Sequence, residues 1–457
     1  MIDQPGAGPL IVSISGIRGI VGQSLTDDTV RRFAHAFATE VPMNARIVLA
    51  RDTRASGQGF AAVAAKALQA AGCHVLDLGI AATPAAKLMV LELQADGAMI
   101  LTASHNPAAW NGMKFVRADG IFLDAATGRR VEGAYHRSRR RTGDGRIESV
   151  SREDVETLLL QRILNVIDAD AIRGAGLRAA VDPCNGAGSL FLPRLLDALD
   201  VQMHLIHGEP NGDFAHEPEP IAENLVDLGR AVVEGDCHVG FAIDPDADRV
   251  TLVSETGQPM GEDLTLALAV QSVTETHKGP VVTTLSTSQV VTDAALRNGC
   301  PVTLTPVGEV HVVDAMIAEG AVIGGEGNGG VILTDVNPGR DAAVGIAVIL
   351  QALARGNKTL SELAATLPAY SIEKRKVSCS PQDLRRALAG LEQKYPKALR
   401  HPVQDGVKLY LAGAFICPWI HLRPSNTEPI VRIIAESEAG QEALELCDVA
   451  EWLLREA

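Results

Sequence analysis

Short apolar runs, polar turns and amphipathic stretches follow one another in a repeated order along most of the chain. Residues 46–50 predict a buried strand, residues 60–71 a helix after a polar turn, and residues 74–78 a second strand. The same order returns at residues 177–206 and again at residues 280–305. Repeats that begin about a hundred residues or more apart indicate successive α/β domains rather than a short-period solenoid.

The last part of the chain has a different order of elements. Residues 408–411, 419–422 and 430–435 predict strands, and residues 441–455 predict a closing amphipathic helix. Strands followed by a helix in a segment of this length are typical of a small α+β module.

The length of the chain also favours several domains. Its 457 residues exceed the size, about 250 to 300 residues, at which a single hydrophobic core stops growing. Polar or glycine-rich stretches near Ser151, Gly257 and Ser371 separate the repeated units. We therefore expect an α/β protein with domains at residues 1–151, 152–256, 257–371 and 372–457.

Composition and charge restrict the class of protein. The 46% of hydrophobic and 21% of charged residues are the proportions of an ordinary globular protein. A net charge of -15 opposes binding to nucleic acids and acidic membranes, and we expect neither as a partner. The longest apolar stretch, residues 342–354, is shorter than the ~20 residues of a membrane span, and the first residues lack a basic segment followed by an apolar one. We expect a cytoplasmic protein.

The cysteines and the basic run suggest no additional site. Seven cysteines show neither a C-x-x-C pair nor metal-ligand spacing, which favours buried, reduced thiols. The run from Arg137 to Arg141 has no interleaved aromatic residue apart from Tyr135, so a solvated loop is favoured over a nucleic-acid patch. An acidic protein can still bind a phosphorylated substrate where basic residues cluster locally.

Ser104 follows the predicted strand at residues 98–101. Because Pro107 prevents a regular strand from continuing, the hydroxyl is expected at the carboxyl end of the strand, at a domain edge. A turn serine that caps a helix is the simpler alternative. The neighbouring His105 could polarise a phosphoryl oxygen or merely bond a carbonyl. Lys114 could act as an acid or base, because burial or nearby positive charge can bring the pKa of a lysine close to neutrality, although a lone lysine is usually solvated.

Three aspartates occupy alternate positions downstream: Asp244, Asp246 and Asp248. In an extended segment alternate side chains point the same way, so these carboxylates could converge on one hard cation. An EF-hand loop is excluded because Arg249 stands where that loop requires glycine. Three carboxylates and a phosphoryl oxygen suit Mg²⁺, and the apolar residues on both sides disfavour a merely solvated acidic turn.

Two other loops offer polar groups to a ligand. Residues 423–429 combine the guanidinium of Arg423 with hydroxyls, an amide and backbone N–H groups, an inventory that matches a phosphate. Glu326 and Asn328 are the only side chains in an otherwise glycine loop, and they would suit the hydroxyl groups of a sugar. A plain turn and a flexible bend are the respective alternatives. Arg18, in a Gly-Ile-Arg-Gly run, is ambiguous by itself.

In their order along the chain these segments resemble the signatures of the α-D-phosphohexomutase family, which comprises phosphoglucomutases, phosphomannomutases and phosphoglucosamine mutases. The segments that carry the resemblance span essentially the whole chain: residues 16–19, 51–54, 102–107, 111–114, 185–188, 244–249, 325–326, 405–408 and 423–429. Single motifs of this kind are weak, but the ordered set is specific.

The resemblance implies three related α/β domains with mixed sheets and a small α+β domain around a central cleft. It implies a phosphoserine at Ser104 and a Mg²⁺ ion bound by Ser104 through its phosphoryl oxygen together with the three aspartates. Glu326 would contact sugar hydroxyls, and Lys114 would be the general acid/base. The groups that would steady charge are His105, Arg18 and Arg249. The groups that would hold the non-reacting phosphate are Arg423, Ser425, Asn426 and Thr427.

The resemblance further implies an intramolecular phosphotransferase that interconverts 6-phospho and 1-phospho sugars through a hexose 1,6-bisphosphate. The expected partner is a small sugar phosphate, and the chain is expected to be a monomer or homodimer. Gly330 stands where many bacterial members have histidine, and Asn426 replaces a commoner glycine. Both features are similar to archaeal-type phosphoglucosamine and phosphomannose mutases, which favours glucosamine phosphate over mannose or glucose.

Two other functions remain as alternatives. A Mg²⁺-dependent phosphatase would gain little from the separate phosphate turn at Arg423. A non-catalytic sugar-phosphate sensor would have no need of Ser104 and Lys114.

Overall fold

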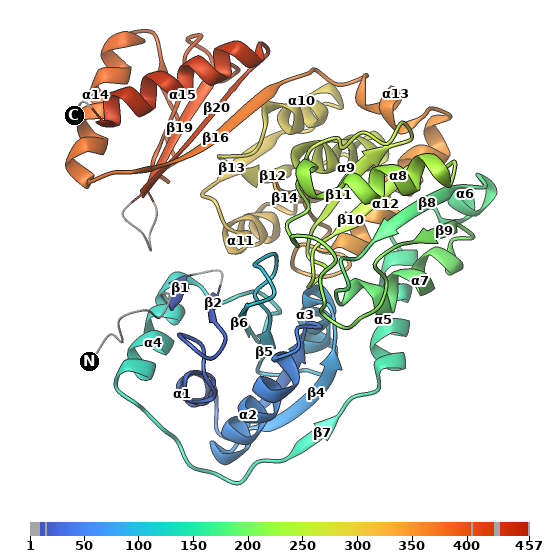
Figure 1. The fold of residues 1–457 in the computed structure, drawn as a ribbon, viewed down its shortest axis with the longest axis vertical. Coiled ribbons are helices and arrows are strands. Elements are labelled where there is room, and N and C mark those ends of the chain that lie inside the picture. Colours follow the sequence, from blue (N-terminus) through green and yellow to red (C-terminus); the bar gives the residue numbers. More distant parts are fainter. Residues whose placement is uncertain (1–9, 14–15, 404, 425–429, 456–457) are drawn as a thin grey trace.

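The computed structural model describes residues 10–13, 16–403, 405–424 and 430–455. Within these residues the chain folds into four successive units, each with its own sheet (Figure 1). The first three units combine mixed sheets with helices and the fourth has an antiparallel sheet, so the predicted α/β fold with a smaller α+β domain is confirmed. None of the helices among the described residues has the length and apolar character needed to cross a membrane.

The first unit has the strand order β1-β2-β6-β5-β3-β4-β7. Strand β3 is parallel to β4 and β5, whereas β6 is antiparallel to β5 and β2. The strands are β1 (Ile11–Ser13), β2 (Gly16–Ile20), β3 (Arg46–Arg51), β4 (His74–Ile80), β5 (Gly97–Leu101), β6 (Trp110–Arg117) and β7 (Ile147–Ser149). The helices are α1 (Asp27–Ala38), α2 (Gly57–Ala70), α3 (Thr83–Glu92) and α4 (Ala125–His136).

The second unit has the strand order β11-β10-β8-β9 and the third has β13-β12-β14-β15. The second unit contains α5 (Arg152–Leu164), α6 (Ala169–Gly174), β8 (Arg178–Asp182), α7 (Gly188–Ala198), β9 (Gln202–Leu205), η1 (Ala222–Asn224), α8 (Val226–Glu234), β10 (Val239–Ile243) and β11 (Val250–Ser254). The third contains α9 (Glu262–Thr276), β12 (Val281–Thr284), α10 (Gln289–Arg297), β13 (Val302–Thr305), α11 (Glu309–Glu319), β14 (Ile323–Glu326), β15 (Gly330–Ile332), α12 (Ala342–Gly356) and α13 (Leu360–Ala364). The predicted strand-helix-strand order is found as β3-α2-β4, β8-α7-β9 and β12-α10-β13, each with its two strands parallel.

The fourth unit has the order β16-β20-β19-β18-β17. Its elements are β16 (Ser371–Ser378), α14 (Pro381–Lys394), β17 (Leu399–Arg400), β18 (Val407–Tyr410), β19 (Trp419–Pro424), β20 (Ile430–Ser437) and α15 (Gly440–Arg455). Helix α15 packs on β16 and β20, with α14 beside it (Figure 1). The sequence pattern did not predict β16, because its side chains are largely charged and only half-buried.

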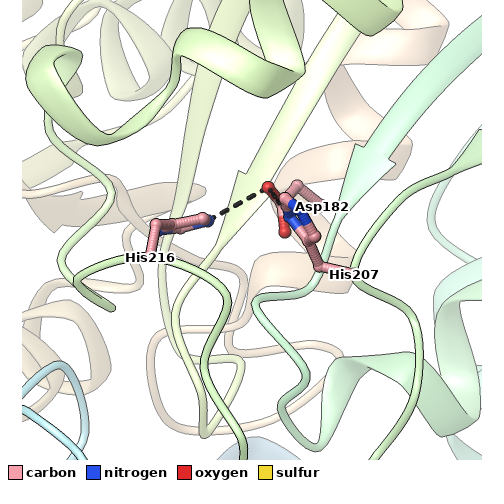
Figure 2. A group of neighbouring side chains, drawn as sticks. All are labelled: Asp182, His207 and His216. Carbon is pink, nitrogen blue, oxygen red and sulfur yellow. Dashed lines mark hydrogen bonds and ion pairs between the residues drawn. The ribbon is translucent and has the colours of Figure 1, made fainter.

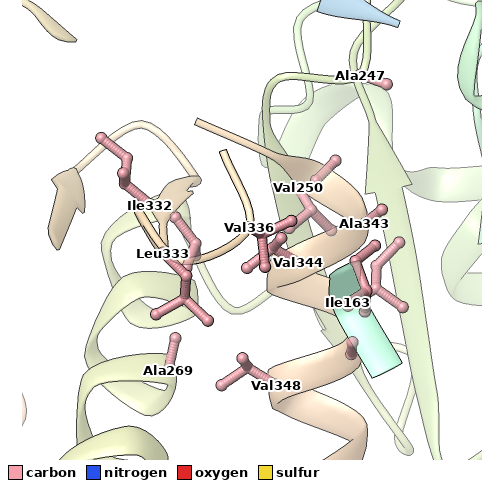
Figure 3. Packing of buried hydrophobic residues seen from close by; sticks show 14 of the residues in the cluster. Ile163, Ala247, Val250, Ala269, Ile332, Leu333, Val336, Ala343, Val344 and Val348 are labelled. Atoms are coloured by element: carbon pink, nitrogen blue, oxygen red, sulfur yellow. The ribbon is translucent and has the colours of Figure 1, made fainter. Parts of the chain in front are cut away.

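One apolar core runs through the first three units, beside separate clusters in the first and second, and the fourth unit has its own. One continuous cluster includes Leu88 of the first unit, Phe241 of the second and Ile346 of the third. Figure 3 shows a part of this cluster in which Ala247 and Val250, around the turn that follows β10, lie near helix α12. A separate cluster lies between the fourth sheet and its helices. Apolar packing therefore fixes the loops of the first three units relative to one another.

Candidate active site

The loop that carries Ser104 leaves the carboxyl end of β5 and is held in place by Arg54. The guanidinium of Arg54 donates hydrogen bonds of 2.6 to 2.9 Å to main-chain carbonyls of Ser104, Asn106, Pro107 and Trp110. Its Nε donates to Asp52 at 3.0 Å, and Asp52 also accepts from the hydroxyl of Thr102 at 2.6 Å. The sequence analysis assigned no role to Arg54 or Asp52, although both lie in a segment that resembles a family signature.

Ser104 is a buried residue in a left-handed backbone conformation. Its φ is 49°, which is uncommon for a residue with a side chain. The hydroxyl donates to Asp244 Oδ2 at 2.8 Å, and its oxygen lies 3.4 Å from Nδ1 of His105. This hydrogen bond joins the first unit to the second at the predicted phosphoryl carrier.

The aspartate run forms the turn between β10 and β11. The expected extended conformation is wrong, because the segment turns sharply and Ala247 has a φ of 55°. Asp244 Oδ1 accepts hydrogen bonds from the backbone N–H groups of Asp248 and Arg249 at 3.1 and 3.2 Å, which closes the turn. The three carboxylates nevertheless converge, each with an oxygen within 4.8 Å of the others. Turn geometry, and not strand alternation, brings them together.

The carboxylate cluster fits a hard divalent cation. Asp246 Oδ1 and Asp248 Oδ1 are buried and have no hydrogen-bond partner among the described residues. Burial, together with the charges of Asp248 and Asp246, raises the pKa of Asp244 well above its ordinary value. Buried oxygens without partners and mutually repelling carboxylates are the features that a Mg²⁺ ion would satisfy.

Lys114 lies on β6 and pairs with the same cluster. Its ammonium donates to Asp246 Oδ2 at 2.6 Å and to Asp248 Oδ2 at 3.0 Å. Burial acts to lower the pKa of Lys114, but the charges of Asp246 and Asp248 outweigh burial and raise it. The expectation that burial or nearby cations bring this pKa close to neutrality is therefore wrong, since the nearest charges are negative.

Three predicted cationic or polar groups surround Ser104. Burial, followed by the charges of Arg249 and Arg18, lowers the pKa of His105 to about 2, so its ring is neutral at pH 7. Burial and the charge of Arg249 also lower the pKa of Arg18. Nε of Arg249 lies 3.5 Å from Asp248 Oδ1. The structure thus brings His105, Arg18 and Arg249 to the same centre as Ser104.

Arg340 is a central residue that the sequence analysis missed. Its guanidinium pairs with Asp248 at 2.7 Å, with Glu326 at 2.6 Å and with Glu309 at 3.0 Å. A Cβ atom at Gly330 would overlap Cδ of Arg340, so the arginine occupies the space that a side chain at position 330 would need. The glycine at 330 was visible in the sequence as a signal of close approach, but its partner was not. Arg340 connects the turn with the aspartates to the sugar loop.

A buried ion pair joins the first unit to the third. Lys87 on α3 pairs with Glu309 on α11, and both side chains are buried. Thr83 at the start of α3 donates to Asp246 Oδ2 at 2.5 Å. The ionic network around Arg340 therefore spans the first three units.

The predicted substrate-binding residues lie in the third and fourth units. Glu326 accepts from the backbone N–H of Gly308 at 3.1 Å in addition to its pair with Arg340. Asn328 Oδ1 is buried and lacks a hydrogen-bond partner among the described residues. Nε of Arg423 donates to both carboxylate oxygens of Asp405, at 2.8 and 2.9 Å. The predicted phosphate-binding residues Ser425, Asn426 and Thr427 lie outside the described residues.

The chain matches family models over each of its four units. These are the models of phosphoglucomutase/phosphomannomutase alpha/beta/alpha domain I at residues 10–142, domain II at residues 159–257, domain III at residues 261–370 and the C-terminal domain at residues 375–451.

Similar proteins extend over the whole length of the chain. A phosphoglucomutase/phosphomannomutase of Thermococcus kodakarensis is 35% identical over 455 residues, covering 97% of this chain and 98% of the relative. A probable phosphoglucosamine mutase of Methanopyrus kandleri is 34% identical, with 95% of each chain covered. The crystal structure of a phosphoglucomutase/phosphomannomutase family protein from Burkholderia thailandensis has a TM-score of 0.84 and 26% identity, with 98% of each chain covered.

Proposed function

Because the chain belongs to the phosphoglucomutase/phosphomannomutase family of intramolecular phosphotransferases, we propose that it interconverts 6-phospho and 1-phospho hexoses through phosphorylated Ser104 and a hexose 1,6-bisphosphate. The observation that carries the proposal is the hydrogen bond of 2.8 Å from the Ser104 hydroxyl to Asp244. This hydrogen bond supports Ser104 as the carrier, because its acceptor belongs to a carboxylate cluster that fits a divalent cation.

In the proposed reaction a sugar hydroxyl oxygen bonds to phosphorus as the bond from phosphorus to Ser104 Oγ breaks. The hydroxyl loses its proton and Ser104 Oγ gains one. We assign both transfers to Lys114, which is protonated beside Asp246 and Asp248 and would first donate its proton to Ser104 Oγ and then take up the proton of the hydroxyl. The second half of the reaction runs in the opposite direction from the other end of the bisphosphate, so that Ser104 is phosphorylated again. Bond making and bond breaking balance over the cycle.

Charge stabilisation is the main requirement of phosphoryl transfer. Mg²⁺ held by Asp244, Asp246, Asp248 and a phosphoryl oxygen on Ser104 would neutralise charge on the transferred group. The charges of Arg18 and Arg249 act on His105, the neighbour of Ser104, and would add positive charge to the site. Neutral His105 can donate or accept one hydrogen bond without adding charge.

Substrate binding is assigned to the third and fourth units. Glu326 and Asn328 would contact sugar hydroxyls, and the unpartnered oxygen of Asn328 supports this assignment. Arg423, oriented by Asp405, would hold the non-reacting phosphate together with Ser425, Asn426 and Thr427. We favour glucosamine phosphate over mannose or glucose phosphate, with support from the glycine at position 330 and from relatives that are named phosphoglucosamine mutases.

The test uses a panel of glucosamine, mannose, glucose and pentose 1-phosphates with Mg²⁺ and a trace of hexose bisphosphate. Ser104→Ala is expected to lower mutase turnover at least about 10³-fold, because the nucleophile is lost. Ser138→Ala is the matched control, since Ser138 also has a φ of 49° but is exposed. Normal turnover by Ser104→Ala would reject the phosphoserine. Release of inorganic phosphate in place of an isomeric sugar phosphate would favour a phosphatase.

A further inference from the structure

A second cluster of metal-type ligands lies in the second unit, outside the site described above. It consists of Asp182, His207 and His216 (Figure 2). Asp182 ends β8, His207 follows β9, and His216 lies in the loop between β9 and α8. One ligand atom from each residue lies within 4.8 Å of the other two. The proposed mutase reaction uses none of these side chains.

Both histidines are directed at the same carboxylate oxygen. Nδ1 of His207 lies 2.9 Å and Nε2 of His216 lies 3.1 Å from Asp182 Oδ2. The other oxygen, Oδ1, accepts the backbone N–H of Cys184 at 2.9 Å, which fixes the orientation of the carboxylate. The three ligand atoms are therefore held around one point.

The hydrogen bond of His216 Nδ1 determines whether Nε2 turns a proton or a lone pair towards Asp182. Nδ1 of His216 lies 2.8 Å from the carbonyl oxygen of Glu217, which can only accept a hydrogen bond. Nδ1 therefore carries a proton, and in the neutral ring Nε2 directs its lone pair at the carboxylate. Two lone pairs at this separation repel each other unless a metal ion or a second proton lies between them. A hydrogen bond from the far nitrogen to a carbonyl is also the usual way in which a metal-binding histidine is oriented.

We propose that Asp182, His207 and His216 bind Zn²⁺, or a divalent transition-metal ion of the same borderline class, with water as the remaining ligand. Two imidazoles and one carboxylate are a ligand set that suits Zn²⁺ and not Mg²⁺. Zinc bonds of about 2.0 to 2.2 Å place neighbouring ligand atoms about 3.3 Å apart in a tetrahedron. The observed separations of 2.9 and 3.1 Å need to lengthen only slightly.

The carboxylate of the cluster is buried, whereas the two histidines are partly exposed, so an ion can enter from solvent. The Asp182 side chain is 1% exposed, whereas His207 is 22% and His216 is 17% exposed. The buried carboxylate supplies negative charge in a poorly solvated place, and the imidazole edges leave a path from solvent. This arrangement suits a bound ion with an open position for water.

A metal ion here would stabilise the segment that packs on the Ser104 loop. The ring of Phe214, between the two histidines in sequence, lies under the guanidinium of Arg54 at 4.9 Å. Asn185 also joins the parts, since its carbonyl accepts from Thr53 at 2.8 Å and its Nδ2 donates to the carbonyl of Glu209 at 3.1 Å. The ion would thus hold this segment against the residue that shapes the Ser104 loop. Metal binding itself does not depend on the proposed function.

A second proton on His216 could take the place of the metal ion between Nε2 and the Asp182 carboxylate. Burial acts to lower the pKa of His216, but hydrogen bonds with Asp182 and Cys184 raise it to about 11. An imidazolium would then pair with Asp182, and no metal would be needed. The experiment must distinguish the proton from the metal.

The test is a Zn²⁺ titration of the metal-free full chain against a chromophoric chelator, with Mg²⁺ in large excess to occupy the Asp244 cluster. We expect one Zn²⁺ per chain, and a Co²⁺ absorption spectrum typical of nitrogen and oxygen ligands. Loss of an outer-sphere partner alone weakens metal affinity about 10- to 100-fold, so His207→Ala and His216→Ala are each expected to weaken it at least about 100-fold.

His204→Ala is the matched control, because His204 is an exposed histidine on β9 outside the cluster. Asp182→Asn keeps an oxygen that can accept the hydrogen bond from the N–H of Cys184, so the turn at Cys184 is retained. It loses the negative charge, and therefore tests whether Zn²⁺ binding needs that charge. Circular dichroism shows whether each variant folds. The proposal is overturned if Zn²⁺ does not bind in the presence of Mg²⁺, or if His207→Ala and His216→Ala bind it as tightly as His204→Ala.

Discussion

The joint between the first three units and the joint between the third and fourth units are built differently. The first three units share a continuous apolar core and a buried ionic network that includes Lys87, Glu309 and Arg340. The fourth unit has its own core. The centre around Ser104 therefore lies where the apolar core and the buried ionic network both extend from one unit to the next.

The joint to the fourth unit includes hydrogen bonds between polar side chains and main-chain groups. Glu436 accepts from the N–H of Gln289 at 2.8 Å, and Lys408 donates to the carbonyl of Leu285 at 2.8 Å. Asp405, which orients Arg423, accepts from the N–H of a third-unit residue at 2.8 Å. Among the described residues no apolar cluster crosses this joint, which we call the adjustable joint, in contrast to the fixed joint between the first three units. The comparison teaches that the proposed function would have phosphoryl transfer at the fixed joint and recognition of the remote phosphate beyond the adjustable one.

The sharpest test of the fixed joint is Asp248→Asn. Asp248 accepts from Lys114 and pairs with Arg340, so removing its charge leaves two buried cations with too little negative charge. We expect mutase turnover at saturating Mg²⁺ to fall by about 10²- to 10³-fold, the size of a lost electrostatic contact in an active site. Asp236→Asn, an exposed carboxylate paired with Arg178, should leave turnover unchanged. A fall of less than tenfold would contradict the central place given to Asp248.

The second test concerns Arg340. Arg340→Met leaves three buried carboxylates without their shared partner, and breaking such a buried ion pair costs about 3 to 5 kcal/mol of unfolding free energy. We expect this loss in urea unfolding, together with a marked fall in kcat/KM. Arg340→Lys should recover stability better than activity, because a lysine lacks the planar fork that reaches Asp248 and Glu326 together. Arg355→Met, at an exposed pair with Asp168, is the control and should change stability by less than about 1 kcal/mol.

A third experiment asks whether the buried pair contributes net stability. Lys87→Met alone leaves Glu309 with only Arg340 and should lower the unfolding free energy by about 3 kcal/mol. The double variant Lys87→Met, Glu309→Leu should recover most of that loss, since apolar replacements of buried pairs are often neutral. If the double variant stayed as far below the wild type as Lys87→Met does, the pair would contribute net stability. Urea unfolding of both variants and the wild type decides this.

The last test lies at the adjustable joint and depends on pH. Burial lowers the pKa of Lys408 from its ordinary value of 10.5 to about 7, although Glu436 acts in the opposite direction. The unfolded chain keeps this proton between these two values while the folded chain releases it, so stability from this group rises with pH from about 7 towards 10.5.

The measurement compares thermal unfolding of the wild type and Lys408→Met across this range. The wild type should gain stability relative to the variant as the pH rises above 7. Lys397→Met, an exposed lysine of the same unit, should show a constant difference from the wild type. A pH-independent difference for Lys408→Met would mean that the buried amine keeps its proton.

The repeated fold was predictable because its signal is local. Apolar runs and helical stretches within about thirty residues define each strand-helix-strand unit, and the structure has them where the pattern predicts. The aspartates and Ser104 were predictable as candidates because their residue types are unusual for their apolar surroundings. The turn that joins the aspartates was not, since alternation of side chains fits an extended strand equally well.

The residues that connect the site could not be found in this way. Lys87 and Glu309 are 222 positions apart, and Arg340 and Asp248 are 92 apart, so no local pattern records either pair. Arg54 acts on carbonyl groups, which every residue has, and the sequence cannot show which ones it will reach. Gly330 gave a partial signal, because an absent side chain indicates that something else fills the space.

The hydrogen bonds that Arg54 and Thr102 make with the main chain of Ser104 have a consequence for the proposed catalytic cycle. The carbonyl of Ser104 accepts from Arg54 at 2.6 Å and its N–H donates to Thr102 at 2.9 Å, so its main chain cannot swing. A phosphate ester on this serine would sweep only the short arc of a single side-chain torsion. The two ends of a hexose are farther apart than that arc. In the proposed cycle the bisphosphate would therefore have to reverse its orientation between the two transfers, while Ser104 stays in place.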